Sequence, residues 1–168
     1  MVTPDKYIRR AYLIALANVS SGSVSVPIYD RRVPVNVIPT PATRIIISSQ
    51  TKQIANETKC GHGWQCSILL DVISEQNNSF VNTAIVDDIE EQISDQIDIW
   101  QAKDHDIKIP PFVCYRTLFS DSHDIEIETP TTTIIRKLIR YTHTLNSIAM
   151  IPDNLNNDFT YQFPFRLA

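Results

Sequence analysis

An apolar stripe with one side chain per helical turn is the strongest structural signal in the chain. It begins after the polar turn at 77–79 and runs to about residue 101, and its members are Val81, Ile85, Ile89, Ile93, Ile97 and Trp100. Acidic side chains lie mostly off the stripe, so the segment is predicted to be an amphipathic helix packed on another layer. With 168 residues, the chain is long enough to bury a core against this helix without disulfides or metal.

A second helix is predicted at residues 4–18. Thr3 suits the N-cap and Pro4 the first helical position, and apolar residues then recur at three-to-four spacing. The serine- and glycine-containing segment 20–23 ends the helix. Residues 24–29 are predicted to form a short strand, and Pro27 within it requires an edge position or a bulge because proline cannot donate to the ladder.

Most of the remaining sequence is typical of β-strands. Strands are predicted at 44–49, 64–74, 112–120 and 125–128, with a polar stretch at 50–63 and turns at 77–79 and 121–124. In the 112–120 strand, alternation places Val113, Tyr115, Thr117 and Phe119 on one face. Residues 131–145 favour a strand, although a helix remains open because these apolar residues also fit a helical stripe: Ile134, Leu138, Tyr141 and Leu145.

This order predicts an α+β fold, a largely antiparallel sheet with two helices packed on one face. We expect residues 1–150 to form a single domain. Residues 151–168 are expected to form an extended C-terminal arm suited to docking on a neighbouring protein through four aromatic residues: Phe159, Tyr161, Phe163 and Phe165.

Cys60, His62 and Cys66 are the most conspicuous candidate metal ligands. Structural zinc sites use about four ligands, usually as two close pairs, and the fourth here would have to be Cys114 or a remote histidine. Alternation places Cys66 on the face of its strand that carries Ile68, which favours a buried apolar role. A small metal-binding module or metal-dependent enzyme centred on the three residues remains the alternative.

No other catalytic or cofactor-binding constellation is evident in the sequence. Three glycines provide no phosphate-cradling loop, and the paired acids at 87–88 and 90–91 point in different directions on a helix. We therefore predict a protein that is not an enzyme and needs no cofactor. Three cysteines and an N-terminus unlike a secretory signal predict free thiols in a protein that stays where it is made. No apolar run approaches the roughly 18 residues of a membrane span, so no membrane partner is expected.

The charge is unevenly distributed along the chain. Residues 1–60 carry eight Lys or Arg against three acids, whereas residues 80–106 carry eight acids against Lys103. One interpretation is two solvated faces; the other is a basic surface that meets the acidic surface of a second copy. The candidate contacts between copies are Arg31, Arg32, Asp87, Asp88, Glu91 and Asp95. A net charge of -4 argues against general nucleic-acid binding.

A further basic cluster lies at Arg136, Lys137 and Arg140. These side chains fit either contact with DNA passing through a pore or salt bridges to the acidic helix of a neighbour.

Five segments follow one another in a characteristic order: the N-terminal helix KYIRRAYLIAL, the strand and turn VPIYDRRVP, the strand PTPATRIIISSQ, the strand GHGWQCSILLDVISEQNN and the long helix SFVNTAIVDDIEEQISDQIDIW. Together they resemble the phage tail-terminator and head–tail joining (neck connector) proteins. His62 and Trp64 at the start of the third strand, and Asp71-Val72-Ile73-Ser74 near its end, match the pattern of that family. The resemblance covers about residues 4–100.

The resemblance implies a bacteriophage virion structural protein, made in the host cytoplasm and located in the neck or tail. It implies a ring of six or twelve copies around the DNA channel, with DNA passing through the lumen without specific binding. Neighbouring portal, neck or tail-tube proteins would lie above and below the ring.

Overall fold

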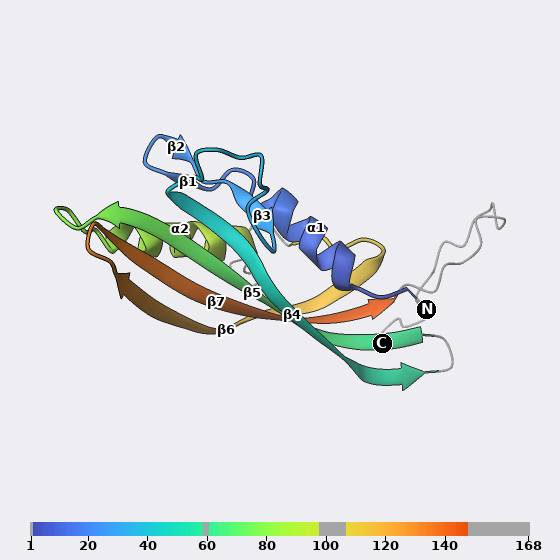
Figure 1. Cartoon of the computed structure of the whole chain (residues 1–168). Helices are drawn as coiled ribbons and strands as arrows, with labels where there is room; N and C mark the ends of the chain where they lie inside the picture. Colours follow the sequence, from blue (N-terminus) through green and yellow to red (C-terminus); the bar gives the residue numbers. More distant parts are fainter. Residues whose placement is uncertain (1, 59–60, 98–106, 148–168) are drawn as a thin grey trace, which may run out of the picture.

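Two helices and a five-stranded sheet make up most of the described chain (Figure 1). The structure is a computed structural model that describes residues 2–58, 61–97 and 107–147, with the side chains of 56–58, 61 and 62 also outside the description. The helices are α1 (Asp5–Ala15) and α2 (Ala84–Ile97). The strands are β1 (Ser20–Ser21), β2 (Val24–Ser25), β3 (Ile28–Asp30), β4 (Thr43–Thr58), β5 (Gly61–Asn77), β6 (Phe112–Glu128) and β7 (Thr132–Ser147).

The main sheet has the strand order β3-β4-β5-β7-β6, and β1 and β2 form a small separate hairpin. All neighbouring strands of the main sheet are antiparallel except β3 and β4, which are parallel. Strands β3 and β6 therefore lie at its opposite edges. Segment 131–145, for which a helix had remained open, is a strand.

Both helices pack on the same face of the sheet, as the sequence predicted. Tyr12 of α1 contacts His143, and Ser94 of α2 contacts Tyr141. Because residues two apart on a strand share a face, these contacts place α1 and α2 on one side of β7. The opposite side of the sheet carries no helix of the described chain (Figure 1). The fold is thus the expected α+β arrangement.

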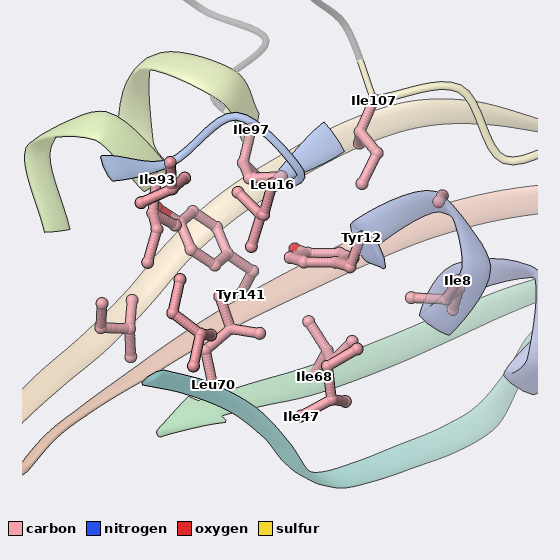
Figure 2. Close-up of a cluster of buried hydrophobic side chains, with 14 of the residues drawn as sticks. Ile8, Tyr12, Leu16, Ile47, Ile68, Leu70, Ile93, Ile97, Ile107 and Tyr141 are labelled. Atoms are coloured by element: carbon pink, nitrogen blue, oxygen red, sulfur yellow. The ribbon is translucent and has the colours of Figure 1, made fainter. Parts of the chain in front are cut away.

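The core lies between the helices and this covered face (Figure 2). The side chains with no exposed surface include Ile8 of α1, Leu16 at its C-cap, Ile93 and Ile97 of α2, and Leu70 of β5. Burying an aliphatic side chain of this size stabilises the fold by about 1.5–3 kcal/mol. The helices are consequently held to the sheet mainly by apolar packing.

Helix α1 is shorter than predicted at both ends, and α2 begins later than predicted. Helix α1 begins at Asp5, and Pro4 rather than Thr3 occupies its N-cap. Helix α2 begins at Ala84, so Val81 lies before it and is 41% exposed. Val86 is buried in place of the half-buried Ile85, and the predicted stripe residue Trp100 lies outside the described residues. Neither described helix is long and apolar enough to cross a membrane.

Two predicted interruptions of the sheet are wrong. Within the polar stretch, residues 50–58 continue β4 and residues 61–63 begin β5, so that the two strands form a long antiparallel pair with bulges at 47–49 and 54–56. Segment 121–124 is not a turn, because β6 runs through it for 17 residues. Bulges at 114–116 and 119–121 shift the register of β6, so Val113 lies on the face opposite Thr117 and Phe119.

Candidate interaction surfaces

The sheet face that carries no helix has a buried ion pair at its centre. Asp71 of β5 has a side chain only 5% exposed and accepts hydrogen bonds from Nε and Nη2 of Arg136 on β7, the first at 3.2 Å. The bonds to Asp71 raise the pKa of Arg136. A second pair, between Arg44 and Glu75 at 2.6 Å, lies on the same face. We call this side of the sheet the open face.

Toward the tip of the β4–β5 hairpin, the side chains of β4 and β5 on the open face are uncharged and polar, whereas the exposed Arg116 of β6 and Arg140 of β7 lie on the same face. Hydroxyl and amide side chains bond across the strands there, Thr51 to Ser67 at 2.6 Å and Gln53 to Gln65 at 2.7 Å. These cross-strand bonds pair exposed polar side chains with one another.

On the covered face, Lys137 joins α2 to both β6 and β7. Its side chain is 8% exposed, and Nζ lies 2.6 Å from Asp87, 3.0 Å from Glu90 and 3.2 Å from Asp124. Burial lowers the pKa of Lys137, but the hydrogen bonds with the three carboxylates outweigh that effect and leave the pKa raised. The sequence nominated Lys137 for DNA or a neighbour; the structure instead places it within the chain, where it fixes Asp87.

An acidic groove of about 890 Å³ lies between α2 and β6. The side chains of Asp88, Glu91 and Asp95 line it together with Asp87 and Phe119. Phe119 is 48% exposed and packs edge-on against Tyr141 at 5.9 Å between ring centroids. The predicted acidic contact residues therefore gather in one groove, and an aromatic ring that the charge pattern did not indicate lies beside them.

The predicted basic contact residues lie at the other edge of the sheet. Arg31 and Arg32 follow β3 and begin a loop of residues 31–42, which we call the basic loop; both arginines are exposed. Arg31 has a φ of 70°, and its backbone N–H bonds to the carbonyl of Ile47 at 3.1 Å. Val35 and Ile38 of the same loop are each 85% exposed. The loop thus presents two cations and two apolar side chains to solvent.

His143 occupies a buried polar site under α1. Its Nε2 lies 2.8 Å from the Tyr12 hydroxyl, and its Nδ1 lies 3.0 Å from Oγ1 of Thr117. Burial lowers the pKa of His143 to about 4, so the ring is neutral at pH 7, with one nitrogen donating and the other accepting. Burial likewise raises the pKa of Tyr12. The three side chains satisfy one another and hold α1 on the sheet.

Cys66 is buried, as its strand alternation predicted. Its side chain is 1% exposed, and burial raises the pKa of its thiol to about 12. A thiol held in the protonated form is a poor metal ligand. Cys60 and the side chain of His62 lie outside the described residues. Within the part that the structure describes, no three His, Cys, Asp or Glu side chains form a potential metal cluster.

The predicted docking arm also lies outside the described residues: Phe159, Tyr161, Phe163 and Phe165. Sequence reasoning missed the pairing of Asp71 with Arg136 because the partners are 65 positions apart. The sequence signal that could have indicated a paired charge was Asp71 itself, a charged residue between apolar neighbours within a predicted strand. The bond between Lys137 and Asp87 could not be predicted either. It depends on which residues of β7 lie under α2, and the apolar periodicity of the sequence does not determine that alignment.

Comparison with solved structures shows that the fold occurs in other proteins. The fold is similar to that of a chain from the virion of a native gene transfer agent (GTA) particle, with a TM-score of 0.55 and 12% sequence identity. The match covers 86% of this chain and 92% of that chain. No protein-family model and no curated protein sequence matches the chain.

Proposed function

We propose that the chain is a virion structural protein of a phage-like particle, acting in the neck or at the tail end as a head–tail connector or tail terminator. The observation that carries this proposal is the similarity in fold to a chain of the gene transfer agent virion over most of both chains. The order of helices and strands, which resembles the tail-terminator and neck proteins, supports the narrower assignment.

In this role the chain acts by geometry and not by catalysis. Copies of the subunit close a ring of six or twelve, with the open face of the sheet directed toward the channel. That face combines paired charges at its centre with uncharged polar side chains on β4 and β5 toward the hairpin tip. Arg140, which pairs with Asp121, and Arg116 add positive charge on the β7 and β6 side of the same face. Paired charges present little net field to a phosphate backbone, which suits DNA that passes without being bound.

The rims of the ring contact the portal or neck proteins on one side and the tail tube on the other. We assign this contact in part to the arm 151–168, whose four aromatic residues supply apolar area at low entropic cost. The chain resides in the particle and needs neither membrane nor cofactor for this function.

The test is to locate the chain in intact particles by electron cryomicroscopy, using an antibody fragment against the folded domain as a label. We expect density at the junction between head and tail, in a closed ring. Label along the whole tail, at its distal tip or in no particle fraction would contradict the proposal. Particles from a strain without the chain should show separated heads and tails, whereas normal joined particles would also contradict it.

A further inference from the structure

We propose that the basic loop of one copy docks in the acidic groove of a second copy, so that the chain assembles head to tail through opposite edges of its sheet. The inference rests on the proposed function, because a ring requires a repeated contact between unlike surfaces. It deepens that function by naming the two surfaces and the side chains that meet.

The position of the two surfaces is the first argument. The basic loop follows β3 at one edge of the sheet, and the groove lies between α2 and β6 at the other edge (Figure 1). A subunit with complementary surfaces on opposite edges binds the next subunit in the same orientation. Such a contact is heterologous, and it closes into a ring when the rotation between copies divides a full turn.

Charge is the second argument. Some charged side chains of the two surfaces already form ion pairs within the chain, and others are available to bind a second copy. Asp87 and Glu90 already bind Lys137, which holds that part of the groove in place. Asp88 and Glu91 are exposed, and no ion pair is recorded for either among the described residues. The same holds for Arg31 and Arg32 on the loop. Two cations and two carboxylates are therefore available for each other.

Apolar exposure is the third argument. Val35 and Ile38 project from the loop with 85% of their surface exposed, although valine and isoleucine are among the residues most often buried. On the other side, Phe119 lines the groove and is 48% exposed, and Tyr115 on the same strand is 62% exposed. Surface ion pairs alone contribute little, about 0–1 kcal/mol each. Burying these apolar side chains at the contact supplies the affinity, while the charges fix the register.

Complementary charge reversals test this contact sharply. One variant carries Arg31→Glu and Arg32→Glu, and the other carries Asp88→Lys and Glu91→Lys. Each alone then brings like charges together and should lower self-association about tenfold or more. In an equimolar mixture, the reversed loop of the first variant meets the reversed groove of the second. The unreversed loop and groove also match, so alternating assembly should return.

Sedimentation velocity and native mass spectrometry at low ionic strength give the readout, with circular dichroism to verify folding. Lys108→Glu, a charge change at an exposed residue that belongs neither to the basic loop nor to the groove lining, is the control and should assemble as the wild type does. A second, charge-neutral variant, Val35→Ala with Ile38→Ala, should also weaken association about tenfold through lost apolar burial. It leaves folding unchanged because both side chains are exposed.

The inference is overturned if each reversal alone assembles like the wild type, or if the mixture assembles no better than its components. It is also overturned if the wild type stays monomeric at millimolar concentration. These outcomes leave the proposed function standing, since that depends on where the chain lies in the particle. Conversely, head-to-tail assembly of a chain found outside the neck and tail would support the contact and reject the function.

Discussion

At the scale of single residues, the structure gives its few buried polar groups clear roles. His143 and Lys137 both lie on β7 and both face the helices, one under α1 and the other under α2. Their neighbours are apolar, so each must find its polar partners locally or pay a desolvation penalty. These two residues therefore tie the helices to the sheet in a specific register, which apolar packing alone does not define.

Replacing Lys137 by methionine should destabilise the fold. The change keeps the length of the side chain but leaves the carboxylates of Asp87, Glu90 and Asp124 gathered around an uncharged group. We expect a loss of about 2 kcal/mol in the free energy of unfolding, below the cost of a fully buried pair because Asp87 and Asp124 are partly solvated. Urea denaturation measures it. Lys108→Met, at an exposed lysine, is the matched control; equal stability of the two variants would contradict the assigned role.

The buried imidazole of His143 should make stability depend on pH. Its pKa falls from 6.5 in the unfolded chain to about 4 in the folded protein, because burial disfavours the charged ring. The folded state then binds fewer protons than the unfolded state between these values, so stability decreases as the pH is lowered from 6.5 toward 4. The full effect is on the order of 3 kcal/mol.

Denaturation of the wild type and His143→Gln across this pH range checks the prediction. The variant retains hydrogen-bonding groups but does not titrate, so its stability should fall less steeply. His123→Gln serves as the control because the His123 side chain is 72% exposed. If the wild type and the His143 variant show parallel pH profiles, the buried site is not the cause.

At the scale of elements, burial determines which strands could be predicted. The alternation of Ile68, Leu70 and Val72 gave the central part of β5 correctly, because only one face of that segment lies under the helices. The half of the hairpin around Thr51 and Gln53 exposes these residues, so no apolar period marks it as a strand.

Strand β6 was broken in the prediction for a related reason. It lies at the edge of the sheet, where side chains are largely exposed, and its Asp121–Asp124 segment has the composition of a turn. Its two bulges also interrupt alternation. The pairing with β7 that extends it is a long-range contact, which local composition does not encode.

The β1–β2 hairpin provides a prediction at this scale. Gly22 has a φ of 59°, whereas Ser23 has no positive φ, which is the pattern of a type II′ turn. A Cβ added at Gly22 would meet nothing within 4 Å, so the cost of Gly22→Ala is conformational and not steric. We expect a loss of about 1 kcal/mol for Ala in the left-handed region. Gly22→Asn, which tolerates that region, should lose less by thermal denaturation; equal losses would contradict the explanation.

At the scale of the whole molecule, fold class and charge separation could be predicted, but the surfaces they form could not. The sequence grouped Asp88, Glu91 and Asp95 as candidate contacts and set them against Arg31 and Arg32. Only the strand order places these groups at opposite edges of one sheet. Phe119 and Ile38 were not predicted as contact residues, because the exposure of an apolar side chain depends on tertiary structure.

Removing residues 151–168 should separate folding from assembly. The described core extends from Ile8 to Leu145, so a chain of residues 1–150 should keep a melting temperature within about 3 °C of the full chain. It should be lost from particles, because the proposed docking arm is missing. Melting curves and immunoblots of purified particles provide the two readouts. A matched variant with the four aromatic residues replaced by serine should behave as the truncation does. If both variants are incorporated into particles at the wild-type level, the arm has no docking role.

The acidity of the groove edge has a consequence for the free subunit. Long edge strands with open backbone groups invite aggregation, and β6 contains neither proline nor lysine to prevent it. It carries Asp121, Asp124, Glu126 and Glu128 instead, next to the carboxylates of α2. Two such edges repel each other, so dimers that pair β6 of one copy edge to edge with β6 of another are disfavoured. The proposed contact between the basic loop and the acidic groove joins unlike edges and does not meet this repulsion.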